Sequence, residues 1–342
     1  MIFSSERLAE VVRLAKKSPE EAAAIAELAV VKSGSFARAQ AAPSDRARVA
    51  IWNMERGRDL EEWLRIDAIR QADVLLLSEL DDGMARSGNV NVPHELASRL
   101  EMHYAFAPNY FDFTRGTRRE RKATRALANA VGLHGNAILS RWPLVDVTRV
   151  PLPLKFDWFQ HHEQRVGTRV ALVAKVDPGT GPITFVAAHL EVFATPEERA
   201  DQMRALLRAL PDSPSPAVLG GDFNTLGVRP SYRRGLELFA RSVRHRGRHV
   251  MAVVRREPLF EEARRAGFSW ENANANEATW RFGGFAPSFA AKLDWAFVRG
   301  LAVEPESVGV VRAVANGSRP AARLSDHDGL ELTVCSPGTR SR

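Results

Sequence analysis

The sequence contains a single cysteine, Cys335, near its C-terminal end. One thiol excludes an intramolecular disulfide and a metal site built from several thiolates, and it suits a reducing compartment. The sequence also lacks a run of about eighteen apolar residues, which excludes a membrane-spanning helix. Its charged first residues do not contain the apolar stretch of a signal peptide. We therefore expect a cytoplasmic protein.

The composition that is present is typical of a globular protein with a sizeable core. Of 342 residues, 45% are hydrophobic and 26% are charged, and the formal net charge is +7. Two segments hold the excess positive charge. Residues 115–125 contain six basic residues and one acidic residue, and residues 229–256 contain nine basic residues and one acidic residue. Because local positive charge attracts polyanions, we expect nucleic acid, another phosphate-bearing polyanion or an anionic membrane surface as partner. The alternative is a solvated, arginine-rich surface.

Residues 1–45 predict a helical extension that ends in a linker. Apolar residues from Leu8 to Ala15 recur at helical spacing. Ser18 and Pro19, followed by two glutamates, are typical of the start of a second helix, which we expect to run toward Ser33. The main domain is then residues 46–335, and residues 336–342 are expected to form a disordered tail.

Short runs rich in valine, leucine and isoleucine predict β-strands along the main domain. Helical segments lie between them, one opening at Asp59 with a predicted capping box and another at Thr195. Many strands with few helices predict an α/β fold in which two sheets pack face to face with helices outside. The predicted strands are residues 49–52, 74–77, 137–139, 170–176, 183–188, 217–219, 295–298 and 330–334.

Almost every predicted strand carries a polar side chain at one end. These residues are Asn53, Glu55, Glu79, Asn136, Arg169, His189, Asp222, Asn224, Asp294, Asp326 and His327. Each one alone is typical of a turn or a solvated surface. Together they supply oxygen ligands for Mg²⁺, amides that orient water and phosphate, and imidazoles that exchange protons. The set therefore indicates phosphodiester hydrolysis.

The order of these residues resembles that of the endonuclease/exonuclease/phosphatase superfamily, the DNase I-like proteins, over residues 46–334. The resemblance implies a four-layer α/β sandwich of two mixed sheets, with the active site at one edge. The family includes deoxyribonucleases, tyrosyl-DNA phosphodiesterases, sphingomyelinases and inositol-polyphosphate phosphatases, so the fold does not choose the substrate. The motifs that carry the resemblance are Asn53, Glu79, Gly135-Asn136, His189, Gly221-Asp222-Phe223-Asn224, Leu293-Asp294 and Ser325-Asp326-His327.

The resemblance also implies how a metal ion is held. Glu79 resembles the principal ligand of Mg²⁺, or of Mn²⁺ in its place, with Asn53 beside it and Asp326 near the metal. Glu55 stands where abasic-site endonucleases carry an aspartate, and its longer side chain argues against ligation.

The resemblance assigns proton transfer and phosphate binding to the remaining positions. Asp222 and Asn224 resemble the pair that activates water and holds the phosphate. His327 resembles the histidine that transfers a proton, with Asp294 orienting it, and His189 resembles a second histidine of the deoxyribonuclease, sphingomyelinase and tyrosyl-DNA phosphodiesterase branches. Two further positions match residues that touch phosphate: Asn136 and Arg169.

The basic segment that follows Asn224 favours a polyanionic substrate, because loops at the sheet edge set specificity. We therefore expect a Mg²⁺-dependent phosphodiesterase or nuclease, and no protein partner. The alternative is a phosphomonoesterase or lipid phosphodiesterase, with Leu236 and Phe239 on an interfacial helix and the aromatic residues of 156–159 as an apolar lip, unless these are core. A third hypothesis is a non-enzymatic binding module. It would require that some of the metal-ligand residues of the family be absent, and the sequence has a suitable residue at each of these positions.

Overall fold

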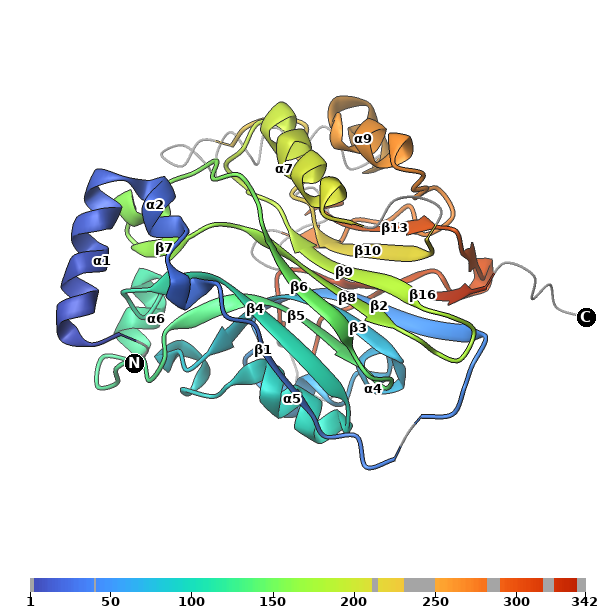
Figure 1. The fold of residues 1–342 in the computed structure, drawn as a ribbon, viewed down its shortest axis with the longest axis horizontal. Coiled ribbons are helices and arrows are strands. Elements are labelled where there is room, and N and C mark those ends of the chain that lie inside the picture. The colour runs from blue at the N-terminus through green and yellow to red at the C-terminus, as the bar shows by residue number, and fades with distance from the viewer. Residues whose placement is uncertain are drawn as a thin grey trace, which may run out of the picture.

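The computed structural model describes residues 3–39, 41–210, 215–230, 250–281, 290–315 and 323–336. Two large β-sheets lie face to face, with helices outside both (Figure 1). This arrangement confirms the predicted α/β sandwich. Among the described residues, no helix combines the length and the apolar character that crossing a membrane requires.

The larger sheet has nine strands, in the order β1-β4-β5-β3-β2-β16-β14, with β15 paired to β16 and β7 paired to β4. β2 and β3 run parallel, whereas β16 is antiparallel to β2. The strands are β1 (Lys32–Ser35), β2 (Arg46–Arg56), β3 (Val74–Asp82), β4 (His103–Asp112), β5 (Leu133–Ser140), β7 (Arg165–Gly167), β14 (Ala302–Val303), β15 (Gly309–Val311) and β16 (Gly329–Cys335).

The smaller sheet has five strands, in the order β13-β10-β9-β8-β6. They are β6 (Val145–Pro151), β8 (Val170–Val176), β9 (Ile183–His189), β10 (Ala217–Asp222) and β13 (Asp294–Arg299). A separate pair consists of β11 (Trp280–Arg281) and β12 (Ala290–Ala291). Every strand predicted from the sequence is present in one of the two large sheets.

Apolar side chains between the sheets explain why the sheets stack. Ile51 and Leu76 of the larger sheet share a buried cluster with Leu172 and Phe185 of the smaller one. The sheets come so close at Gly220 that a Cβ atom there would lie 2.5 Å from Ile51 Cδ1. A side chain at the centre of β10 would therefore require Ile51 to move.

Helices cover the outer face of each sheet and bury a second and a third apolar cluster (Figure 1). The capping box at Thr195 begins α7. A helix also begins after Asp59, but Asp59 adopts a left-handed conformation with φ 57°, so the predicted capping box is wrong there. The helices are α3 (Leu60–Trp63), α4 (Asp67–Gln71), α5 (Val92–Leu100), α6 (Arg118–Ala123), α7 (Pro196–Arg208) and α9 (Leu259–Arg265), with short 3₁₀ helices at Ala26–Leu28, Ala85–Ser87, Trp158–Gln160, Val250–Arg256 and Pro305–Ser307.

The N-terminal segment packs on the larger sheet. α1 (Ser5–Lys17) and α2 (Pro19–Ala23) bury Val11 and Ala22 in the same cluster as the outer face of that sheet. The second helix ends at Ala23, short of the predicted end, because Lys32–Ser35 pairs with β4 as a strand and so satisfies an otherwise open sheet edge. The boundary at residue 45 stays a prediction, and the predicted tail lies outside the described residues except for Ser336.

A buried ion pair connects α7 to the chain that follows β10. Arg199 donates from Nε to Glu257 Oε2 at 3.1 Å and from Nη2 to the Val228 carbonyl at 3.3 Å. The Arg199 and Glu257 side chains are fully buried.

We expect Arg199→Met to lower the free energy of unfolding by about 3–5 kcal/mol, because the Glu257 carboxylate would stay buried without its partner. Arg204→Met is the matched control on the same helix. Arg204 is 41% exposed, so its ion pairs with Asp201 and Glu262 should each stabilise the fold far less than the buried pair does. Urea denaturation followed by circular dichroism measures both changes. Equal destabilisation of the two variants would show that the buried pair is not what stabilises this junction.

Candidate active site

Three strands of the smaller sheet end at one edge and bring three polar side chains together. Asp222 at the end of β10 lies opposite His189 of β9 and opposite Asp294 of β13 in the strand registers. All three side chains are buried. A Cβ atom at Gly221, where φ is 146°, would lie 1.8 Å from the Ala188 carbonyl oxygen, so only glycine lets β10 reach Asp222 beside β9.

The larger sheet meets this edge with side chains of its own. Asn53 of β2 donates from Nδ2 to Asp222 Oδ2 at 3.1 Å, which links the two sheets. The pairing of β2 with β3 shifts register after Asn53, and β3 shifts against β5 between Leu77 and Leu80. Glu79 lies inside that irregularity with φ 57°. Such bulges redirect side chains, and here the redirected one is the predicted metal ligand.

His327 enters the site just before β16 and is held on three sides. Its Nδ1 donates to Asp294 Oδ2 at 2.8 Å, its backbone N–H donates to Ser325 Oγ, and its carbonyl accepts from Trp52 Nε1. Burial alone would lower the pKa of His327, but the carboxylates of Asp294 and Asp222 hold that pKa well above its ordinary value. These two carboxylates therefore favour the protonated form of His327.

His189 has the opposite protonation state. Arg169 Nη1 lies 2.9 Å from His189 Nδ1, and because a guanidinium only donates, Nδ1 carries no proton. Burial and the charge of Arg169 hold the pKa of His189 well below its ordinary value. The proton of this neutral imidazole therefore sits on Nε2, which lies 3.4 Å from Asp222 Oδ2.

Asp222 thus lies between a neutral and a protonated imidazole. His327 Nε2 is 3.6 Å from its Oδ2, and the Asn224 backbone N–H donates to its Oδ1 at 2.9 Å. Asn224 Nδ2 donates to the Leu190 carbonyl at 2.9 Å. The same nitrogen lies 3.2 Å from His189 Nε2, where it faces the proton of that imidazole and does not donate to it. Burial raises the pKa of Asp222 to about 7, against the charge of His327.

Glu79 is oriented by an arginine that the sequence analysis did not single out. Arg56 Nη1 donates to Glu79 Oε2 at 2.8 Å, and the same guanidinium lies 3.5 Å from Glu120 and 3.8 Å from Glu163. Burial raises the pKa of Glu79, but the positive charge of Arg56 outweighs burial and holds that pKa well below its ordinary value. The sequence feature that could have identified Arg56 as a site residue is its position three residues after Asn53.

Asn136 and Arg169 lie behind this first layer of side chains. Asn136 is fully buried, and its Nδ2 donates to the Val170 carbonyl at 2.8 Å. Arg169 donates from Nε to Glu191 Oε2 at 3.3 Å as well as to His189. Glu191, a further residue that the sequence analysis did not select for the site, also accepts from Trp158 Nε1 at 3.0 Å. The predicted phosphate contacts of Asn136 and Arg169 stay predictions.

Two carboxylates lie at the more open side of the site. The Asp326 backbone N–H donates to Glu55 Oε2 at 3.0 Å, and both side chains are partly exposed. Burial and the charge of Asp326 raise the pKa of Glu55. Asp326 Oδ1 lies 4.0 Å from His327 Nε2.

The donor set fits a divalent metal ion. Carboxylate and amide oxygens are the ligands of hard cations such as Mg²⁺. Two buried carboxylates, those of Asp222 and Asp294, offer oxygen atoms that lie within 4.8 Å of each other. Protonated His327, the third member of that group, has no lone pair to offer a metal. Asp294 Oδ1 is buried and has no hydrogen-bond partner within the described part of the chain.

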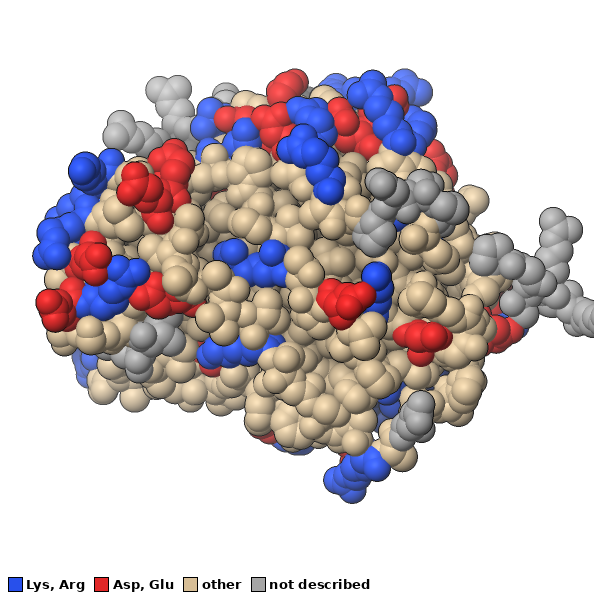
Figure 2. Space-filling view, in the orientation of Figure 1, with Lys and Arg blue, Asp and Glu red and all other residues tan. Residues whose placement is uncertain are grey.

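The two predicted basic segments have different outcomes. Residues 118–123 form α6, on and beside which Arg118, Arg119, Lys122 and Arg125 are exposed. Residues 231–249, with Leu236 and Phe239, lie outside the described residues. On the face seen in Figure 2, basic and acidic side chains alternate over α7 and α9.

The predicted apolar lip is wrong for two of its three aromatic residues. Trp158 and Phe159 are buried, because Trp158 packs under Arg165 and donates to Glu191, while Phe159 packs against Phe113. Phe156 is partly buried. These residues are therefore mainly core, the alternative that the sequence left open.

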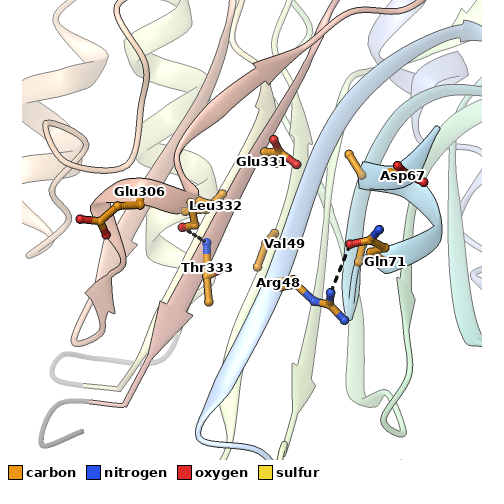
Figure 3. Close-up of a pocket in the computed structure, with 11 residues that line it drawn as sticks. Arg48, Val49, Asp67, Gln71, Glu306, Glu331, Leu332 and Thr333 are labelled. Atoms are coloured by element: carbon orange, nitrogen blue, oxygen red, sulfur yellow. Dashed lines mark hydrogen bonds between the residues drawn. The ribbon is translucent and has the colours of Figure 1, made fainter. Parts of the chain in front are cut away.

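A cavity of about 230 Å³ lies at the other end of β2 (Figure 3). Arg48, near the start of β2, lines it together with Asp67 and Glu331. It contains none of the predicted site residues. The candidate active site therefore lies at the sheet edge and not in this cavity.

Comparison with solved structures returns proteins of the same fold at low identity. An endonuclease/exonuclease/phosphatase from Beutenbergia cavernae aligns with a TM-score of 0.54 and 20% identity over 87% of this chain and 73% of that chain. Humanized TDP2 from D. rerio aligns with a TM-score of 0.50 and 16% identity over 86% of this chain and 100% of that chain. The human Nocturnin catalytic domain with a bound sulfate anion aligns with a TM-score of 0.50 and 17% identity over 89% of this chain and 96% of that chain.

Comparison at the level of sequence identifies the family. No curated protein matches the chain significantly. The sequence model of the Endonuclease/Exonuclease/phosphatase family matches residues 50–327, a range that spans the site from Asn53 to His327. The chain therefore belongs to the Endonuclease/Exonuclease/phosphatase family, a superfamily of phosphoester hydrolases.

Proposed function

We propose that this protein is a Mg²⁺-dependent phosphodiesterase that hydrolyses nucleic acid. The observation that carries the proposal is the buried Asp222 carboxylate, which lies 3.4 Å from neutral His189 and 3.6 Å from protonated His327. A proton acceptor and a proton donor thus face one small space, as hydrolysis of a phosphodiester requires.

Glu79, Asn53 and Asp326 are the residues that would hold Mg²⁺, or Mn²⁺ in its place. A bound divalent cation supplies positive charge to the non-bridging oxygens and so favours the transition state. The low pKa of Glu79 keeps its carboxylate ionised at neutral pH. Arg56 occupies one oxygen of Glu79 and leaves the other directed toward the site, where it lies 4.0 Å from His189 Nδ1.

The protein's own groups divide the proton transfers. Asp222 accepts a proton from the attacking water, which Asn224 helps to orient. His327, kept protonated by Asp294, donates from Nε2 to the leaving oxygen. His189 offers its Nε2 proton to the phosphate, and Arg169 fixes that tautomer through Nδ1. Arg169 thus acts through His189 as a positioning residue.

Nucleic acid is the substrate that the described charges favour. The exposed cations of α6 (Arg118, Arg119 and Lys122) belong to the helix whose Glu120 lies 3.5 Å from Arg56, the partner of Glu79. A backbone that carries one charge per nucleotide can follow such a face. A phosphomonoesterase or lipid phosphodiesterase would use the same chemistry and is the competing function.

An activity screen with and without Mg²⁺ tests the proposal. The substrates are plasmid DNA, single-stranded DNA, RNA, sphingomyelin, inositol phosphates and bis(4-nitrophenyl) phosphate. We expect Mg²⁺-dependent cleavage of a nucleic acid at higher kcat/KM than of the lipid or the inositol phosphates. Preference for either of the latter would favour the competing function.

Glu79→Gln should abolish Mg²⁺-dependent hydrolysis and weaken Mg²⁺ binding, because the amide removes the ionised oxygen ligand. Isothermal titration with Mg²⁺ measures binding independently of turnover. Glu61→Gln is the matched control, since Glu61 is an exposed glutamate that pairs with Arg99. Normal Mg²⁺ affinity in Glu79→Gln would refute the ligand assignment.

Arg56→Gln should lower Mg²⁺ affinity or kcat by about 10–100-fold, because residues that orient a ligand contribute on that scale. Arg65→Gln removes an exposed arginine that pairs with Glu62 and should change neither quantity. Thermal melting checks that both variants are folded. A folded Arg56→Gln protein with wild-type affinity and turnover would show that Glu79 does not need this partner.

Asp294→Asn should move the alkaline limb of the pH profile of kcat/KM to lower pH. The carboxylate raises the pKa of His327, so its removal lets His327 lose the required proton at lower pH. Activity at acidic pH should fall less than activity at alkaline pH. Asp146→Asn, at an exposed partner of Lys175, is the control. A uniform loss at every pH would indicate a structural role alone.

A further inference from the structure

Beyond His327, three arginines converge on one carboxylate. Asp328 is fully buried, and it accepts from Arg281 Nε at 3.1 Å, from Arg312 Nη1 at 2.6 Å and from Arg323 Nη2 at 3.2 Å. The arginines come from β11, from the chain after β15 and from the chain before His327. Their side chains are 25%, 44% and 24% exposed. Three cations are thus held at the surface by one buried anion.

The hydrogen-bonding capacity of Asp328 is already used. Its Oδ1 also accepts from the Ala313 backbone N–H at 3.1 Å, so each carboxylate oxygen accepts two hydrogen bonds. A carboxylate has about four acceptor sites. The guanidinium groups retain donors: within the described ranges, the two terminal nitrogens of Arg281 have no acceptor. Arg312 has one further partner, the half-exposed Glu277, at 3.2 Å. The cluster therefore keeps a surplus of positive charge and of N–H groups.

The cluster adjoins the segment that carries the catalytic histidine. The Arg281 backbone N–H donates to the Asp326 carbonyl at 3.0 Å, and Arg323 Nε donates to the Ser325 carbonyl at 3.0 Å. Trp280, next to Arg281, forms a β-bridge with His327. Two of the arginines are therefore attached to the backbone just before His327, and all three bond the side chain of Asp328 just after it.

The strand order places the arginines and α6 on opposite sides of the centre of the site. β2, which carries Asn53, lies between β3, which carries Glu79, and β16, which His327 precedes. α6 is linked to Glu79 through Glu120 and Arg56, whereas the arginines adjoin His327. A phosphate chain that crosses the site would meet cations on both sides.

We propose that Arg281, Arg312 and Arg323 form a second phosphate subsite, which binds a phosphate adjacent to the scissile one in a nucleic-acid strand. Guanidinium groups bind phosphate oxygens through paired N–H donors, and the saturated Asp328 holds the three groups in place. The inference rests on the proposed function, because it assigns the substrate of that site. It predicts that the protein prefers a chain of phosphates over a single phosphodiester.

The test compares Arg312→Gln and the double variant Arg281→Gln/Arg312→Gln with the wild type. Arg265→Gln on α9 is the control, an exposed arginine that pairs with Glu261. Fluorescence anisotropy in EDTA measures binding of a single strand of about twelve nucleotides, a length in the usual range of such sites. Kinetics in Mg²⁺ compare that strand with bis(4-nitrophenyl) phosphate, and melting curves confirm folding.

We expect the double variant to bind the strand about tenfold more weakly and to show a flatter log–log salt dependence, by roughly 0.7 for each phosphate that the variant no longer neutralises. Its kcat/KM should fall further for the strand than for the small ester, and Arg265→Gln should leave the ratio of the two unchanged. Unaltered strand binding by the folded double variant, or a selective loss of binding to anionic vesicles, would overturn the inference. Failure of the wild type to cleave either substrate would instead count against the proposed function, because binding in EDTA is measured without turnover.

Discussion

The hydrogen bond from Asn53 to Asp222 joins the two sheets at the edge where their polar side chains meet. Asp222 belongs to the smaller sheet and Asn53 to the larger, so the bond spans the line along which the apolar faces stack. The sheets pack closely at Gly220, where a Cβ atom would lie 2.5 Å from Ile51 Cδ1. This close approach brings the side chains of Asn53 and Asp222 within hydrogen-bonding distance.

Charged neighbours then favour a different protonation state for each buried histidine. His189 and His327 have the same side chain and are both buried, yet Arg169 faces one and Asp294 faces the other. A cation beside a buried imidazole disfavours its proton, and a carboxylate favours it. One fold thereby supplies a neutral histidine and a charged one within reach of the same carboxylate.

The arginines of the site act mainly through other side chains. Arg56 orients Glu79, and Arg169 fixes the tautomer of His189. Placing such charges inside a protein is costly unless each finds a partner, which explains why these arginines lie in networks with several acids. The cluster at Asp328 differs, because its arginines are partly exposed and outnumber the carboxylate that holds them. The positive charge that Asp328 does not neutralise is available to an anionic ligand.

The sequence by itself determined eight of the strands, since runs such as Val170–Val176 pair as expected, and it determined the family through the ordered motifs from Asn53 to Ser325-Asp326-His327. Local patterns carry that information because apolar periodicity and strand-end residues are properties of neighbouring positions. Only the tertiary structure decided that Lys32–Ser35 is an edge strand, that Trp158 is core, and that Arg56 pairs with Glu79. Each of these depends on a partner distant in the sequence, and that contact forms only once the chain has folded.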